Sequence, residues 1–236
     1  MAAAAGAPVT HRAVDDGRFV LEGALDLGAP FTSVADVTIG GRLHEFTAGP
    51  VGLADDVART LGVERFDEEL TYRGGTLLTA RTRPYDPQIQ LTEDRLVAVW
   101  RGRRHCFLTE LYGATTTDLL GVLRTLSVRE HDDGLTLSPN AKSGAEFAAP
   151  ATVLKEIPGL GLLELAPLTR QRVGRLPTWR GLRTGAGELF RDTLPDGTPY
   201  FVLAAADVWL SLVPFADTAV EQVPALVDQL RVRTAR

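Results

Sequence analysis

Short apolar runs, separated by glycine and proline, dominate the pattern of hydrophobic and polar positions along the chain. Val34 to Phe46 is apolar on both sides of Gly40-Gly41, a dipeptide that supplies the positive φ of a hairpin turn. A hairpin is therefore predicted there. The same criteria predict further strands over residues 19–27, 70–81, 89–100, 105–112, 135–137, 160–165, 200–204 and 208–215.

Four other segments have the period of an amphipathic helix. They span residues 52–62, 115–126, 147–157 and 218–230. Thr117 is the predicted N-cap of the second helix, and Thr218 with Glu221 fits a capping box at the start of the fourth. Pro224 interrupts the fourth pattern, so it either kinks this helix or marks the point where regular helix starts.

The C-terminal strand pair and helix repeat an earlier segment of the chain. Residues 106–111 match residues 208–213 in character at every position except Glu110, which falls opposite Leu212. This alignment pairs Cys106 with Val208. A short insertion then aligns the ends of the two helices that follow. We therefore expect an internal duplication.

These patterns predict an α+β fold of antiparallel sheet, in one or two layers, with helices packed on one face. Two structurally similar halves, related by a pseudo-twofold, would pack as one domain because each must bury the same kind of apolar face. We expect a flexible leader over residues 1–17, a first half over 18–130 and a second half over 131–236.

The composition is that of an ordinary globular protein, with 44% hydrophobic and 23% charged residues. The formal net charge of −5 argues against nucleic acid as a partner, because nucleic-acid binders neutralise phosphates with positive charge. A single cysteine, Cys106, excludes an internal disulfide and favours a reducing compartment. Neither a signal peptide nor an apolar run long enough to span a membrane is recognisable, so we expect a cytoplasmic protein with no membrane partner. The excess of arginine over lysine indicates a GC-rich genome.

One grouping suggests a nucleophile, namely Cys106 with His105 and His131, because a thiolate needs an imidazole or another cation nearby. Adjacent residues of a strand point to opposite faces, so His105 and Cys106 cannot line one pocket, and Cys106 is interpreted as a core residue. The four histidines lack any spacing that brings two ligands to one metal, and no phosphate-binding glycine loop is present. We therefore expect no metal and no cofactor, and the sequence leans against an enzyme.

The most concentrated charge lies in an arginine-rich segment in the second half of the chain. Its members are Arg170, Arg172, Arg175, Trp179, Arg180, Arg183 and Arg191, with Glu188 as the single acid among them. Guanidinium groups around an aromatic ring suit phosphate or a carboxylate-rich partner, so residues 170–183 are a predicted anion- or partner-binding site. The alternative is an exposed connector whose arginines pair with the acidic residues between 55 and 69.

The leading hypothesis is a non-catalytic, cytoplasmic α+β binding module for another protein, of the chaperone or adaptor kind. One alternative is a small-molecule or anion-binding protein, or an enzyme, with its site between the two halves. Another is a subunit of a larger assembly or a homo-oligomer. The sequence leaves all three open.

The strand Trp209-Leu210-Ser211 and the predicted helix after it resemble the C-terminal end of the specific chaperones of actinobacterial type VII secretion, which are pseudo-symmetric α+β proteins. The resemblance covers the C-terminal segment alone. It implies the same class of function, the binding of a protein partner.

Overall fold

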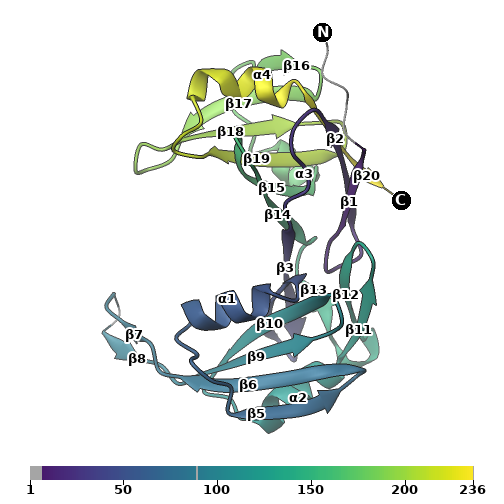
Figure 1. Ribbon diagram of the computed structural model, residues 1–236, viewed down its shortest axis with the longest axis vertical. Coiled ribbons are helices and arrows are strands. Elements are labelled where there is room, and N and C mark those ends of the chain that lie inside the picture. Colours follow the sequence, from purple (N-terminus) through teal and green to yellow (C-terminus); the bar gives the residue numbers. More distant parts are fainter. Residues whose placement is uncertain (1–6, 89, 236) are drawn as a thin grey trace. The chain divides into compact units, whose positions relative to one another are not determined.

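A computed structural model describes residues 7–88 and 90–235 (Figure 1). Antiparallel sheet dominates it, with 51% of residues in strands and 14% in helices. The expectation of antiparallel sheet is confirmed, but the helices are few and short. The fold is therefore sheet-dominated and does not have a clear helical layer on one face.

The chain divides into two compact units. Unit 1 comprises the described residues up to 13, residues 17–31 and those from 152 onward, and unit 2 comprises residues 14–16 and 32–151. These bounds differ from those of the expected halves, because most of the described residues up to 31 belong to the same unit as the C-terminal part. Residues 1–6 of the expected leader, and Ile89 of an expected strand, lie outside the described residues.

Unit 2 is built on a six-stranded antiparallel sheet. Its spatial order is β3 (Phe31–Ile39), β4 (Arg42–Pro50), β10 (His105–Tyr112), β9 (Arg95–Arg101), β6 (Gly75–Thr82) and β5 (Glu68–Tyr72). The predicted β3–β4 hairpin is confirmed, with φ of +57° and +77° at Gly40 and Gly41. The remaining elements are α1 (Leu53–Thr60), β7 (Tyr85–Asp86), β8 (Leu91–Thr92), α2 (Thr116–Arg124), β11 (Leu126–His131), β12 (Gly134–Pro139), the 3-10 turn η1 (Ala141–Ser143) and β13 (Glu146–Phe147).

The two faces of this sheet carry different cores. Helix α1 lies over one face, where Ala54 and Ala58 pack with Cys106, Leu108 and Val99 (Figure 1). The small alanine side chains let the helix approach the strands closely. Aromatic rings fill the opposite face, where Phe107 stacks on Trp100 and meets Phe46 edge-on, with ring centroids 5.7 and 5.8 Å apart.

Unit 1 is built on a second six-stranded antiparallel sheet. Its spatial order is β14 (Thr152–Ile157), β15 (Gly161–Pro167), β19 (Val208–Pro214), β18 (Pro199–Ala204), β17 (Gly187–Thr193) and β16 (Leu182–Thr184). A separate set of strands joins both ends of the chain, since β2 (Arg18–Gly23) pairs with β1 (Val9–Arg12) and with β20 (Leu230–Ala235). The short helical elements are α3 (Arg170–Val173), η2 (Val220–Gln222) and α4 (Val223–Val227).

Strand β1 falls inside the range expected to be a flexible leader. Residues 9–12 form a ladder with β2, and His11 is buried with its ring centroid 4.3 Å from that of Phe31. This part of the chain is therefore ordered strand. Its sequence lacks a sustained period because only four residues take part.

The two units have the same order of elements. In each sheet the first two strands along the chain are followed in space by the sixth, fifth, fourth and third strands. A helix follows the second strand in each unit (α1 and α3), and another follows the sixth (α2 and α4). A further strand then follows the second helix, β11 in one unit and β20 in the other.

The ladders correct the register of the sequence match between the units. Leu108 pairs with Val99 in unit 2, and Ser211 pairs with Val202 in unit 1. Leu108 faces α1, whereas Trp209, two residues before Ser211, packs against the segment that contains α3. Pairing Cys106 with Val208 therefore matches opposite faces of the sheets. A shift of one residue, to Trp209, matches equivalent faces, because side chains of a strand alternate.

The helix predicted over residues 147–157 is wrong. Residues 152–157 form strand β14, whose buried positions are Val153, Lys155 and Ile157. A lysine at a buried position hides the alternation that would have indicated a strand. Its Nζ donates a hydrogen bond to the carbonyl oxygen of Ala29, which compensates in part for the burial of the ammonium group.

The two terminal helices are shorter than predicted. Helix α2 ends at Arg124 and α4 at Val227, and the residues after them form β11 and β20. Thr115 is the N-cap of α2, in a capping box with Asp118, and not Thr117. The capping box predicted at Thr218 is absent because α4 starts beyond it, with Pro224 in its first turn.

A polar link ties each of these last strands to a hairpin turn. In unit 2 the carboxylate of Glu130, on β11, accepts backbone N–H bonds from Arg103, Arg104 and His105, at 3.0, 2.6 and 2.7 Å. In unit 1 the carboxylate lies in the turn, where Asp207 accepts bonds from the backbone N–H, at 2.9 Å, and the hydroxyl of Thr234 on β20. The two units thus make the same connection with donor and acceptor exchanged.

Candidate functional site

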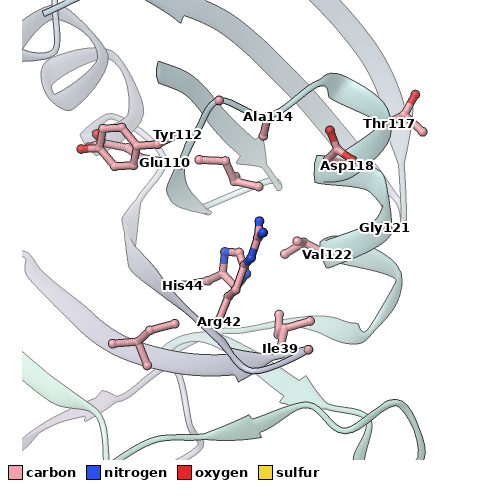
Figure 2. A pocket seen from close by; sticks show the side chains of 14 residues that line it. Ile39, Arg42, His44, Glu110, Tyr112, Ala114, Thr117, Asp118, Gly121 and Val122 are labelled. Atoms are coloured by element: carbon pink, nitrogen blue, oxygen red, sulfur yellow. The ribbon is translucent and has the colours of Figure 1, made fainter. Parts of the chain in front are cut away.

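A groove of about 600 Å³ opens in unit 2 where the ends of β4 and β10 meet α2 (Figure 2). Arg42 and His44 reach it from β4, and Asp118 and Val122 lie along α2. Gly121 keeps the helical wall low, because a Cβ at this position would have no heavy atom within 4 Å. The space beside Gly121 is therefore open.

The charged groups in the groove have different environments. Burial, and then the neighbouring Arg42, lower the pKa of His44, so its imidazole is neutral at pH 7. The hydroxyl and backbone N–H of Thr115 lower the pKa of Asp118, whose carboxylate is engaged in capping α2. Arg42 is the exposed cation of the groove.

A second hollow, of about 470 Å³, adjoins the groove and shares Leu43, Glu110 and Tyr112 with it. It is acidic, since Asp36 and Glu45 are direct neighbours across the β3–β4 ladder and both line it. Burial, followed by the negative charges of Asp36 and Glu110, raises the pKa of Glu45. The hollow therefore has a negative potential at neutral pH.

Part of this acidity is neutralised internally. Glu110 pairs with Arg95 at 2.9 Å, and the Arg95 side chain is only 11% exposed. The same guanidinium donates to the hydroxyl of Thr82 and to the carbonyl of Leu61. Arg95 is thus held by three polar groups and keeps Glu110 in place, which leaves Asp36 and Glu45 as the acids that face the hollow.

Two large apolar side chains stand at the shared rim of the two hollows. Leu43 is 61% exposed and Tyr112 is 58% exposed. Each lines both hollows. Exposed apolar side chains are common singly, but a pair at the mouth of a cavity gives a surface on which a ligand would remove apolar area from water.

The arginine-rich segment lies in unit 1, from α3 to the short edge strand β16. Leu168 and Leu176 pack against Phe190, Val202 and Trp209 of the sheet. Arg170, Arg175, Trp179, Arg180 and Arg183 are exposed.

Arg172 behaves differently from the other predicted site residues. Its guanidinium lies 5.8 Å from the ring centroid of Trp209 and 3.6 Å from the carboxylate of Glu164. Its side chain is only 25% exposed. It therefore anchors the segment to the sheet, and the other five residues of the predicted site are exposed.

The histidine and cysteine grouping does not form a catalytic site. Burial raises the pKa of Cys106 to about 11, and its thiol donates to the carbonyl of Pro50 at 3.3 Å. His105 lies 3.5 Å from Glu130, and His131 lies 3.1 Å from the hydroxyl of Thr136. Within residues 7–88 and 90–235, no group of three or more His, Cys, Asp or Glu could hold a metal ion.

The groove was not visible in the sequence. Its residues come from segments far apart along the chain, and only the strand register brings Leu43 and Tyr112 to one rim. The one available signal in the sequence was position: Leu43 and Tyr112 are apolar residues at the ends of strands, and each is close to a glycine turn. Glycine turns are too frequent for that signal to identify a site.

The comparisons with known proteins identify no relative. The chain matches no family model, no curated protein and no solved structure. Among the described residues, no helix has the length and apolar character needed to cross a membrane. The function is therefore argued from the geometry alone.

Proposed function

We propose that the protein is a non-catalytic binding module that holds a segment of a partner protein in the groove of unit 2. The observation that carries this proposal is the exposed pair Leu43 and Tyr112 at the rim shared by two adjoining hollows. Burying two such side chains against a partner supplies the apolar contact around which protein interfaces are organised.

The charges beside the rim define the chemistry of the partner segment. Burial, and then the negative charges of Asp36 and Glu110, raise the pKa of Glu45, and a cation beside it would offset the effect of those charges. The partner segment therefore places an apolar side chain between Leu43 and Tyr112 and a lysine or arginine next to Glu45. Such a segment matches the apolar rim by its apolar side chain and the acidic hollow by its sign of charge.

The test compares two double variants of the full chain. Leu43→Ser with Tyr112→Ser removes the apolar rim, and Tyr85→Ser with Leu91→Ser is the matched control. The control side chains are 61% and 53% exposed and belong to the β7–β8 hairpin of the same unit. The expected result is that the native protein and the control retain the same partner in affinity purification, and that the rim variant loses it while its melting temperature is unchanged.

A groove-filling variant sharpens this test. Gly121→Leu places a side chain in the open space beside α2, and leucine has a higher helix propensity than glycine, so the helix is not weakened. Loss of the partner on filling the groove, with folding intact, separates occupancy of the groove from a general effect of surface polarity. Retention of the partner by both the rim variant and the filled variant contradicts the proposal.

One observation favours a second candidate function, the binding of a small molecule. The volume of the groove is within the range of ligand pockets, roughly 300 to 1,000 Å³. Arg42 and neutral His44 would then contact an anionic or polar group. A ligand of this kind raises the melting temperature of the native protein and not that of Gly121→Leu.

A role as a subunit of a larger assembly, or as a homo-oligomer, stays an expectation. Light scattering at two protein concentrations tests it.

A further inference from the structure

We propose that the arginine-rich segment of unit 1 is a second docking surface, which binds an extended acidic segment of a protein along the edge strand β16. It is independent of the groove in unit 2, because the two surfaces share no residue. Three features of the segment carry the proposal, namely its charge, its exposed apolar side chains and its position at a sheet edge.

Most of the charge of the segment is not used within unit 1, and the exception is Arg172, which lies 3.6 Å from Glu164. Arg170, Arg175, Arg180 and Arg183 are exposed, and none of them makes an ion pair within the described residues of this unit. Two of the acids to which the alternative interpretation assigned them have other partners, since Asp55 pairs with Arg101 and Asp56 with Arg59. Glu188 lies opposite Arg183 across the β16–β17 ladder, but its carboxylate accepts the backbone N–H of Gly181 at 2.9 Å. Four exposed guanidinium groups without an ion pair among the described residues of unit 1 favour a partner that supplies several carboxylates.

Large apolar side chains are interleaved with these arginines. Val173, Trp179 and Leu182 are 48%, 54% and 55% exposed. They differ in this respect from Leu168 and Leu176 of the same part of the chain, whose side chains pack on the sheet. An occupant that presents only charge would leave this apolar area in water, so the occupant carries apolar side chains as well.

The position of β16 distinguishes a polypeptide from other polyanions. β16 pairs with β17 on one side and ends the sheet of unit 1 on the other, within the described residues of that unit. An edge strand presents backbone N–H and C=O groups that an extended peptide can satisfy by adding a strand. A nucleic acid has no complementary backbone for this ladder, and the net charge of −5 disfavours it further.

Alternation along β16 fits such an occupant. Leu182 and Arg183 are successive residues, so one apolar and one cationic side chain point to opposite faces of the sheet. A peptide that alternates acidic and apolar residues would place its acids beside Arg183 and its apolar side chains beside Leu182. The occupant is therefore an acidic, β-branched, extended segment of a partner protein.

Trp179 gives a direct measurement of binding. The other two tryptophans, Trp100 and Trp209, are only 3% and 8% exposed, so a change of fluorescence on titration reports mainly on Trp179. The probe is a short peptide alternating glutamate and valine, titrated into the full chain at low and at high salt. The comparison probes are a lysine–valine peptide, a backbone N-methylated glutamate–valine peptide and single-stranded oligothymidylate.

The expected result is binding of the glutamate–valine peptide that weakens with salt and is lost on N-methylation. Arg175→Glu with Arg180→Glu reduces the affinity about tenfold or more, whereas the control pair Arg103→Glu with Arg124→Glu, exposed arginines of unit 2, leaves it unchanged. Absence of peptide binding, tighter binding of the oligothymidylate, or equal binding by both variants overturns the proposal. None of these outcomes bears on the rim variant of the groove.

Discussion

At the scale of single residues, Glu130 does more for the fold than its place on a surface hairpin suggests. Its carboxylate accepts three backbone N–H bonds from the β9–β10 turn and is 21% exposed. We expect Glu130→Gln to lower the free energy of unfolding by about 2 kcal/mol, because the charge that strengthens these bonds is lost. Urea denaturation measures this change. Asp132→Asn is the control, since Asp132 is 94% exposed and its pairing with Arg104 contributes little.

The same contacts predict how the stability contributed by Glu130 depends on pH. Desolvation is the largest influence and raises the pKa of Glu130, but the three amides together with His105 outweigh it and lower the pKa below the usual 4.5. A carboxyl whose pKa is lower in the folded state stabilises the fold above its unfolded-state pKa and loses this contribution as the pH falls through the folded value. The difference between native protein and Glu130→Gln should therefore shrink below pH 4.5. A difference that stays constant down to pH 3 would contradict it.

At Cys106 the pKa shifts in the opposite direction from that of Glu130, because burial dominates. The apolar cluster beneath α1 raises the pKa of its thiol to about 11, so thiolate is scarce at neutral pH. Because side chains alternate along a strand, the sequence alone predicted that Cys106 and His105 point to opposite faces of β10. Chemistry that depends on one strand could be predicted from the sequence, whereas the groove, which depends on the register of several, could not.

At the scale of elements, the sequence predicted strands and hairpins better than helix ends. The run from Leu123 to Leu126 fits both a helix stripe and the start of an alternating strand, and the structure ends α2 between them. Lys155 concealed β14 in the same way, because its burial depends on the carbonyl of Ala29, far away along the chain. A local sequence pattern does not show contacts with residues that are distant along the chain. The start of β11 and the whole of β14 were therefore predicted as helix.

The equivalent strands β11 and β20 predict equivalent sensitivities. Leu126 and Leu230 are 1% and 0% exposed and begin the two strands. We expect Leu126→Ala and Leu230→Ala each to lower the free energy of unfolding by about 2 to 5 kcal/mol, since each leaves a cavity. Denaturant melts measure this, with the exposed Ser127→Ala as the control. Equal stabilities of the Leu126→Ala and Ser127→Ala variants would contradict this prediction.

At the scale of the whole molecule, the common connectivity of the two units is what an internal duplication predicts, and we retain duplication as a proposal. The exchange of donor and acceptor between the Glu130 and Asp207 links points the same way. The surfaces that differ between the two units are those with exposed charged and apolar side chains. Unit 2 has an acidic hollow at Asp36 and Glu45, and α3 is followed by arginines where α1 is followed mainly by acids. Divergence of two copies would place separate binding surfaces on one chain.

The continuity of unit 2 gives the last prediction. Residues 14–16 join it because the backbone of Val14 donates to the hydroxyl of Ser33 at 2.9 Å and accepts from the N–H of Leu137 at 2.8 Å. A fragment of residues 14–151 contains every strand of the six-stranded sheet and both hollows of this unit. We expect it to unfold cooperatively on heating, as measured by calorimetry, and to keep the groove.

The matching fragment of unit 1 supplies the control for that measurement. Residues 152–235 alone lack β2, with which β20 forms its ladder, so β20 would lose its partner along its full length. We expect this fragment to aggregate or to melt without cooperativity, because an unpaired strand exposes backbone groups and the buried side of Leu230 and Val232. A fragment 14–151 that lacks a cooperative transition, or a fragment 152–235 that shows one, would mean that the contacts within each unit do not determine its stability.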